Sequence, residues 1–478
     1  MKRKRTRYRL AALLLTALFA LLIGYGYYSY SAYGTRWFAS VNNPRLRKVK
    51  TDVTAGTVYD RDGVILAQTV DGRRTYADSA LVRRAMVHLL GDRAGNVSNG
   101  MDTFLSSYLL GFKTTLFERI GQLAGGQPQR GDDVVLSVDA ALSVKAAQAF
   151  NAKCPGKTGA AVVMNYRTGE VLVLESFPEY DPDSIPASAK TDPDNPFWNR
   201  ATRALLAPGS TFKIVTAAAA MRTIPDVTGR VFECDGRLPV KNRFITDAGN
   251  AVHGTITLQE AFVNSCNNVF AQLALETGDE ALRKTAERFG FNDNFLFQDL
   301  VVENSVYPTG KRDDVEVAWS GVGQSALLAT PMHMCMIASA IANDGVMMEP
   351  ALLLSATAAT GGSHYDFTPR VYHTTLSPEE AGMIRGLMRQ AVTDGTGRSA
   401  AVAGCSVCGK TGSAEASLNG KSVTNAWFVG FIENEKTPYA VCVLVENGGS
   451  GGSAAAPVAG AILSAAVKLT KEAGNGTK

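Results

Sequence analysis

The chain has 478 residues, of which 46% are hydrophobic and 19% charged, with 46 glycines and 18 prolines. This composition is that of a globular protein, and it excludes disordered, collagen-like and disulfide-scaffold chains. Six of the 48 basic residues lie within the first nine positions, and the remaining 42 face 44 acidic residues, so the rest of the chain carries −2. Since a nucleic-acid-binding protein carries its basic excess on a folded face, the composition argues against nucleic acid as a partner.

The first predicted element is a membrane span. Residues 1–9 form a basic tail, and residues 10–28 (LAALLLTALFALLIGYGYY) follow without a charge, which is close to the ~20 apolar residues that cross a bilayer as a helix. Basic residues before the span predict a cytoplasmic N-terminus and place the rest of the chain on the outer face. The alternatives are a signal peptide, cut near Ser29 or Ser31, and a nuclear-localisation tract. The run is longer than the apolar core of a signal peptide, which favours an uncleaved anchor.

Residues 35–129 are predicted to form a first, small folded domain. Two β-type runs, at residues 57–59 and 64–66, are separated by Asp-Arg-Asp-Gly, which predicts a hairpin. Residues 79–90 have helical spacing. Glycines and polar residues at 121–133 then mark the expected boundary with the next domain.

Residues 132–470 are predicted to form the second domain, an α/β (α+β) fold. Strands are expected at both ends of this segment and helices between them, which predicts an antiparallel sheet flanked by helices, with its first and last strands side by side. The expected strands are residues 134–139, 160–165, 170–176, 406–416, 425–433 and 439–446. The expected helices are residues 141–152, 212–221, 258–263, 268–276, 332–343 and 457–468.

Seven cysteines are scattered along the chain, at positions 154, 234, 266, 335, 405, 408 and 442. Most are expected to be small buried apolar residues. Cys405 and Cys408 are the one pair at metal or redox spacing, but no second pair completes the four ligands that zinc needs. The run Met332–Met336, with His333 inside it, begins an apolar helical stretch and is expected to lie in the core. We therefore expect no metal site and no cofactor.

Ser210 and Lys213 form the only Ser-x-x-Lys of the chain, and they follow Ala-Pro-Gly at the predicted start of a helix. Three residues span about one helical turn, so the lysine amine lies on the face of the serine hydroxyl and can take its proton. Burial lowers a lysine pKa towards neutrality, and the helix N-terminus favours negative charge at the serine. So short a pattern also arises by chance, as a serine at a helix start followed by an exposed lysine.

Two further clusters contain residues suited to a catalytic site. Ser265 and Asn267 interrupt two apolar helical stretches, where they either face a cleft or cap a helix; Ser-x-Asn also occurs at 40–42 and 417–419. Lys410-Thr411-Gly412 has a second copy at 157–159. Only order and context separate these copies.

Three segments in order, APGSTFK at 207–213, SCN at 265–267 and GKTGSAEA at 409–416, resemble the three motifs of the penicillin-binding proteins and serine β-lactamases. The segments VHGTITLQEAFVNSCNN, SGVGQSALLATP and TNAWFVGF are similar to the transpeptidase branch. GTVYDRDGVILAQT resembles the class B type, which has an anchor, a noncatalytic pedestal and a C-terminal transpeptidase domain. The family usually has Arg where this chain has Ala55, which puts in doubt a salt bridge between the pedestal and the catalytic domain.

The resemblance implies a role for each matching residue. Ser210 would attack the carbonyl between the two terminal D-alanines of a peptidoglycan stem peptide, with Lys213 as general base. Ser265 would relay a proton to the leaving amine, and Asn267 would hold Lys213 and the substrate amide.

The remaining implied roles concern substrate binding. Lys410 and Thr411 would bind the terminal carboxylate, and Gly412 would let the strand approach the substrate. The backbone N–H groups of Ser210 and Ser413 would form the oxyanion hole.

The resemblance implies a serine D,D-transpeptidase that cross-links stem peptides through an acyl-enzyme and is inhibited by β-lactams. A polytopic glycan polymerase that works through the span and pedestal is the implied partner. The alternatives are a D,D-carboxypeptidase or β-lactamase in which water accepts the acyl group, a membrane-tethered β-lactam receptor, and a noncatalytic scaffold.

Overall fold

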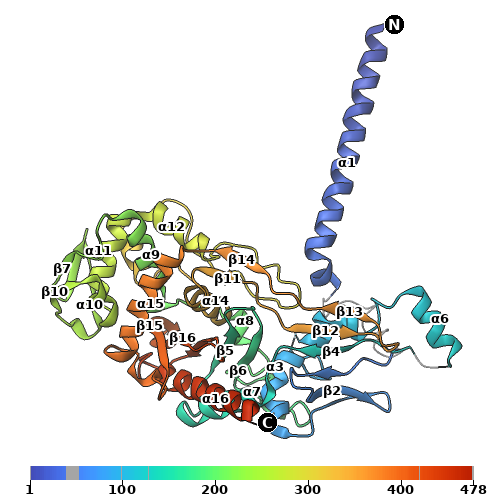
Figure 1. The fold of residues 1–478 in the computed structure, drawn as a ribbon. Coiled ribbons are helices and arrows are strands. Elements are labelled where there is room, and N and C mark those ends of the chain that lie inside the picture. Colours follow the sequence, from blue (N-terminus) through green and yellow to red (C-terminus); the bar gives the residue numbers. More distant parts are fainter. Residues whose placement is uncertain (1, 39–52, 98–99, 127–128, 419, 476–478) are drawn as a thin grey trace.

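The computed structural model describes residues 2–38, 53–97, 100–126, 129–418 and 420–475. Helix α1 (Lys2–Phe38) stands apart from the rest of the molecule (Figure 1). Its segment Tyr8–Ser29 has a mean hydropathy of 2.1 and is long and apolar enough to cross a membrane. The helix contains all of the predicted span at residues 10–28.

A five-stranded antiparallel sheet forms the centre of the second domain. Its strand order is β15–β16–β17–β5–β6, so β17, the last strand in the chain, pairs with β5. The last expected strand therefore meets the second one, at residues 160–165, whereas the first, at residues 134–139, falls on β4 (Asp133–Leu136) of another sheet, so the prediction was wrong for that strand. The strands are β5 (Gly159–Asn165), β6 (Val171–Phe177), β15 (Ser406–Leu418), β16 (Lys421–Glu433) and β17 (Tyr439–Val445).

Helices cover both faces of this sheet. Along β17, Val441 and Val443 join one apolar cluster while Cys442 and Leu444 join another, because successive side chains of a strand point to opposite faces. One face packs against α7 (Ala140–Lys153) and α16 (Ala455–Asn475), and the other against α14 (Pro331–Ala342). The layering explains why these strands read as continuous apolar runs rather than as alternating ones.

A second sheet has six strands, in the order β13–β12–β4–β1–β2–β3, and lies on the side of the molecule where α6 is found (Figure 1). The predicted hairpin is present, since β1 and β2 pair antiparallel. β1 also pairs in parallel with β4, so the sheet takes strands from both sides of the expected boundary between residues 129 and 132, and the domain division stays a prediction. The strands are β1 (Val58–Tyr59), β2 (Ile65–Val70), β3 (Arg73–Tyr76), β4 (Asp133–Leu136), β12 (Leu353–Thr357) and β13 (Ser363–Asp366).

Ion pairs connect the N-terminal segment to the later chain. Arg83 binds Asp181 at 2.7 Å, and Arg61 lies 3.5 Å from Glu170. The N-terminal segment and the later chain are therefore joined by ion pairs although residue 55 is Ala instead of Arg. The helices of the N-terminal segment are α3 (Ala80–Leu90), α4 (Met101–Phe104), α5 (Ser106–Leu109) and α6 (Leu116–Ala124).

The remaining helices lie between residues 200 and 393. Three of these helices, α9, α10 and α11, were predicted, at 212–221, 258–263 and 268–276, and the other four were not. The seven helices are α8 (Arg200–Arg203), α9 (Lys213–Thr223), α10 (Leu258–Val263), α11 (Asn267–Thr277), α12 (Asp279–Arg288), α13 (Asp314–Gly321) and α15 (Pro378–Thr393).

Small two-stranded sheets complete the fold, and none of them was predicted. β7, β10, α10 and α11 lie at the end of the molecule away from α6 (Figure 1). The strands are β7 (Val231–Cys234), β8 (Arg237–Val240), β9 (Arg243–Thr246), β10 (Gly254–Thr257), β11 (Val346–Met348) and β14 (Val371–Thr374).

Candidate active site

Ser210 lies in a 3₁₀ turn, Gly209–Phe212, that leads directly into α9. In a 3₁₀ turn, residues three apart are eclipsed, so Ser210 and Lys213 are on the same side. Gly209 has φ +55°, and its N–H donates to the Gly323 carbonyl at 2.9 Å. Within the part of the chain that the structure describes, the Ser210 hydroxyl makes no hydrogen bond, which leaves its proton available to a base.

The Lys213 side chain is fully buried. Its Nζ donates to the Ser265 carbonyl at 2.6 Å and to Asn267 Oδ1 at 2.8 Å. Burial disfavours the ammonium form and lowers the pKa of Lys213 to about 7, although electrostatic interactions with Cys266 and Asp247 oppose the shift. A neutral amine has two N–H donors and one lone pair. Because two acceptors occupy both donors, the lone pair can accept a proton from a hydroxyl, and the Ser265 hydroxyl lies 3.4 Å from Nζ.

Ser265 connects the first motif to the third. It lies between α10 and α11 with φ +59°, a conformation that costs energy in a residue other than glycine and is typical of functional sites. In this conformation its carbonyl accepts from Lys213, and its hydroxyl lies 2.9 Å from Lys410 Nζ and 3.4 Å from Lys213 Nζ. One serine therefore contacts both lysines.

Asn267 is held in place by the residues around it. Its backbone N–H donates to the Asp247 carboxylate, and its Nδ2 donates to the Thr246 carbonyl at 2.9 Å, which turns Oδ1 towards Lys213. Asp247 also accepts from Asn268 Nδ2 at 2.9 Å. Nothing in the sequence marked Asp247, because its contact with the second motif is made only in the folded chain.

Lys410 lies in β15 and is fully buried. Besides Ser265, its Nζ donates to the Thr411 carbonyl at 3.1 Å. Burial, and repulsion by Lys213, hold the pKa of Lys410 well below its usual range. The next hydroxyl, on Thr411, lies 2.6 Å from the hydroxyl of Thr396, a neighbour that no motif in the sequence identified.

Gly412 lets β15 pack against the turn that holds Ser210. A Cβ at this position would lie 2.8 Å from the Pro208 carbonyl oxygen and 3.2 Å from the Thr211 nitrogen. The sequence predicted a need for close approach here, to the substrate; the structure adds a second reason, which is contact with the chain before Ser210. Ser413 follows on β15 and is exposed.

The second copy of the third motif lies elsewhere. Lys157 precedes β5, and its Nζ donates to the Asn447 carbonyl at 2.7 Å. The structure thus brings Lys410 to Ser265 and places Lys157 at another surface. Of the other Ser-x-Asn copies, residues 40–42 lie outside the described residues, and in the copy at 417–419 the asparagine does.

A pocket of about 310 Å³ lies near the β15 end of the candidate active site. Trp319, Gln324 and Glu415 are among the residues that line it. Gln324 follows Gly323, which contacts Gly209, and Glu415 is two residues beyond Ser413 on β15. The pocket therefore lies near the site, along β15, although no candidate site residue lines it. The one cluster of metal-ligating side chains in the described chain lies behind the second motif, at Cys234, Asp247, His253 and Cys266.

Comparisons with known proteins show which family and which folds this chain is similar to. The family model of the penicillin-binding protein transpeptidase domain matches residues 159–464. The peptidoglycan D,D-transpeptidase PbpA of Mycolicibacterium smegmatis is 31% identical over 461 residues, which cover 89% of this chain and 92% of the relative. The peptidoglycan D,D-transpeptidase MrdA of Acinetobacter baumannii is 29% identical and is covered to 53% of its length, over 69% of this chain. The solved structure of penicillin-binding protein A from Mycobacterium tuberculosis, a ceftriaxone acyl-enzyme complex, superimposes with a TM-score of 0.79 and 28% identity, over 87% of this chain and 99% of that one.

Proposed function

The chain belongs to the family of penicillin-binding protein transpeptidases, and from this premise we propose that it is a class B peptidoglycan D,D-transpeptidase that works through a serine acyl-enzyme. One observation carries the proposal. Three segments that lie far apart in the chain converge on one place: Ser265 contacts both Lys213 and Lys410, and Gly412 packs against the turn that holds Ser210.

The first half-reaction acylates Ser210. Lys213 takes the proton of the Ser210 hydroxyl as the oxygen attacks the carbonyl carbon between the two terminal D-alanines. The backbone N–H groups of Ser210 and Ser413 donate to the oxygen that becomes negative. The C–N bond then breaks, and Ser265 passes the proton from Lys213 to the leaving amine of D-alanine.

The third motif binds the terminal carboxylate of the donor peptide. A carboxylate near Lys410 favours the ammonium form of this buried side chain, and Thr411 donates its hydroxyl to the same group. The bond to Thr396 fixes the rotamer of Thr411. β15 is an edge strand of its sheet, so an extended peptide can add to it as a further strand, towards the pocket at Trp319.

The second half-reaction forms the cross-link. The amine of a neighbouring stem peptide attacks the acyl carbon, the bond to Ser210 Oγ breaks, and a proton returns to this oxygen. β-Lactams acylate the same serine and block the second step. Solved relatives are acyl-enzymes of ceftriaxone, imipenem and penicillin G, which supports this inhibition.

The location and partner of the enzyme are part of the proposal. We propose that the catalytic site lies on the outer face of a bacterial cytoplasmic membrane. In this proposal the chain consists of a basic tail (residues 1–9), a transmembrane anchor (10–28), a pedestal (35–129) and a transpeptidase domain (132–470). The six basic residues before the span support this orientation. We propose a polytopic glycan polymerase as the partner, bound through the span and pedestal, because the resemblance to the class B type implies one.

A direct test compares the wild type with Ser210→Ala in two assays. Membranes are first exposed to a fluorescent penicillin, and the purified full-length protein is then given lipid-linked peptidoglycan strands. We expect the wild type to become labelled and to form cross-linked peptides, and Ser210→Ala to do neither. Release of D-alanine without cross-links would favour a carboxypeptidase, and labelling without any turnover would favour a receptor.

A further inference from the structure

Four side chains that bind transition metals meet directly behind the second motif. Cys234 ends β7, Asp247 follows β9, His253 precedes β10, and Cys266 lies between Ser265 and Asn267. One ligand atom from each lies within 4.8 Å of all the others. We propose that these four residues bind a zinc ion that holds the second motif in its active arrangement. The proposal does not depend on the transpeptidase reaction.

The distances between the ligand atoms fit a tetrahedral ion. Cys266 Sγ lies 3.5 Å from Cys234 Sγ and 3.4 Å from Asp247 Oδ2. Cys234 Sγ lies 3.1 Å from Asp247 Oδ2 and 3.3 Å from His253 Nδ1, which is 3.7 Å from the Asp247 oxygen. Zinc bonds of about 2.0–2.3 Å give tetrahedron edges of about 3.3–3.8 Å. Four of the five distances lie within this range.

The chemistry of the ligands selects zinc. Two thiolates, an imidazole and one carboxylate form a set that zinc prefers, whereas calcium and magnesium take oxygen ligands. Cys234, Asp247 and Cys266 are buried, and the His253 side chain is 17% exposed, which gives the ion a way in. Binding replaces the two thiol protons, which pass to solvent.

Outer hydrogen bonds already orient two of the ligands. Val269 N–H donates to Cys266 Sγ at 3.4 Å, and Asn268 Nδ2 donates to Asp247 at 2.9 Å. Such bonds are a regular feature of metal sites, since they fix the direction of the ligand and lower its negative charge.

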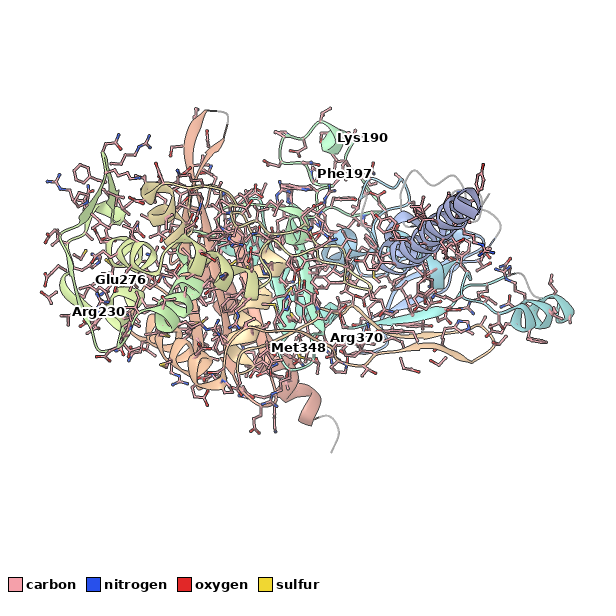
Figure 2. All side chains as sticks on the ribbon, turned by 90° about the horizontal axis from the view of Figure 1, so that it is seen from above. Lys190, Phe197, Arg230, Glu276, Met348 and Arg370 are labelled. Atoms are coloured by element: carbon pink, nitrogen blue, oxygen red, sulfur yellow. The ribbon has the colours of Figure 1, made fainter. Side chains whose placement is uncertain are left out.

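The ion would act on the catalytic residues by position. Cys266 lies between Ser265 and Asn267, and Asp247 accepts the Asn267 backbone N–H. Across the same two parts of the chain, Arg230 before β7 pairs with Glu276 of α11 at 2.7 Å, and Figure 2 shows this pair at one end of the molecule. An exposed ion pair of this kind contributes little, so the metal would reinforce the hydrogen bonds that Asp247 and Thr246 make with Asn267, next to the strained turn at Ser265.

The sequence did not predict this site. Its ligands come from four separate segments, without the short paired spacing that marks zinc sites in a sequence. A disulfide between Cys234 and Cys266 is the other use of these thiols, and it needs an S–S distance of about 2.05 Å rather than the observed 3.5 Å.

The test measures metal and thiols in the full-length protein, purified in detergent without chelators. We expect about one zinc per chain by elemental mass spectrometry and seven free thiols after denaturation in chelator. Cys234→Ala and His253→Ala should lose the zinc, whereas Cys335→Ala, which removes a buried cysteine outside the cluster, should keep it. No zinc in the wild type, with five free thiols and a mass lower by two protons, would show the disulfide and overturn the proposal.

Two further measurements keep the test decisive if a variant folds poorly. Metal-free wild type titrated with cobalt should develop thiolate-to-metal charge-transfer bands and the intense visible bands of a tetrahedral ion, which zinc then removes. Acylation by fluorescent penicillin should slow about tenfold or more in the metal-free protein and recover with zinc. Absence of the cobalt bands would overturn the site, and acylation that is indifferent to zinc would overturn its positioning role. If the wild type binds zinc but forms no cross-links, the zinc proposal stands and the proposed transpeptidase function does not.

Discussion

The two buried lysines of the site have different surroundings, and these fit them for different tasks. Lys213 gives its N–H groups to two neutral oxygens, of Ser265 and Asn267, and needs no positive charge to keep them. Lys410 donates to the Ser265 hydroxyl and to its neighbour's carbonyl, and retains a further donor for a substrate anion when it is charged. A base and an anion-binding cation can thus lie on either side of one serine.

The low pKa of Lys213 leads to a prediction about pH. Burial disfavours the ammonium form and lowers the pKa from about 10.5 to about 7, so the fraction of neutral amine rises as pH increases through this value. The rate of acylation by penicillin should rise over the same interval and then level off. Lys213→Arg should reduce it about 10²–10⁴-fold, because a guanidinium does not act as a base. Stopped-flow acylation across the pH range measures both effects, and a rate that falls with pH would contradict the assignment.

The choice between two Lys-Thr-Gly copies gives a second prediction. Lys410→Ala should slow acylation about 10²-fold or more, since it removes a buried donor aimed at Ser265 and at the substrate carboxylate. Lys157→Ala should leave the rate almost unchanged, because Lys157 binds only the Asn447 carbonyl near the surface. The second-order rate constant with fluorescent penicillin is the measurement. The reverse ranking would be incompatible with the site described above.

At the scale of single residues, the sequence predicted the types and order of the motif residues but not their supports. Ser210 and Lys213 are near in sequence, so their shared side follows from local geometry. Thr396 and Asp247 reach the motifs only through tertiary contacts, which no spacing reveals. The positive φ of Ser265 is also invisible in sequence, since serine seldom adopts it without surrounding support.

At the scale of elements, the position of β15 against the Ser210 turn decides the width of the site. The strand approaches so closely at Gly412 because no side chain intervenes. The turn is held from the other side by Gly323, where a Cβ would lie 1.9 Å from the Gly209 carbonyl oxygen. Glycines on both sides thus set where Ser210 lies.

A pair of glycine substitutions tests this packing. Gly412→Ala should destabilise the protein by about 1–3 kcal/mol, because its methyl group meets backbone atoms that cannot move aside easily, and it should slow acylation by shifting β15. Gly382→Ala is the matched control: Gly382 is exposed within α15, and a methyl group added there would have nothing within 4 Å. It should stabilise the protein by about 0.5–1 kcal/mol. Thermal unfolding of the full-length variants measures the stability change, and fluorescent penicillin measures the rate of acylation. The packing argument would be refuted if Gly412→Ala and Gly382→Ala changed stability and acylation equally.

The same scale shows which elements could be predicted. Buried strands such as β5 and β17 and apolar helices such as α14 stand out as hydrophobic runs, and they lie within a few residues of the predicted ranges. The two-stranded sheets at β7–β10 are short and half exposed, so they lack a distinctive pattern. α15 was missed although its start carries a capping box, in which Ser377 and Glu380 cap each other's backbone.

At the scale of the whole molecule, the N-terminal segment from residue 53 onward and the later chain share one mixed sheet. The six-stranded sheet contains β1 and β2 from the N-terminal segment together with β12 and β13 from the later chain. Arg83 and Arg93 add ion pairs to Asp181 and Asp183. Prediction from sequence divides a chain into consecutive domains. It could not show that β12 returns to pair with β4, a strand far from it along the chain.

The topology of the chain gives the last prediction. Helix α1 stands apart from the folded body, and its six basic residues precede its uncharged run at residues 10–28. Moving such a basic cluster across the membrane is unfavourable, so the N-terminus should remain in the cytoplasm. Protease added to intact spheroplasts should therefore digest the catalytic domain and leave a short protected N-terminal fragment. A cytoplasmic protein that survives in the same sample shows that the membrane is intact. Replacing Lys2, Arg3, Lys4 and Arg5 with neutral residues should weaken this orientation and increase the protected fraction. A protected catalytic domain in the wild type, or a mature chain that begins near Ala32, would contradict the anchor and its direction.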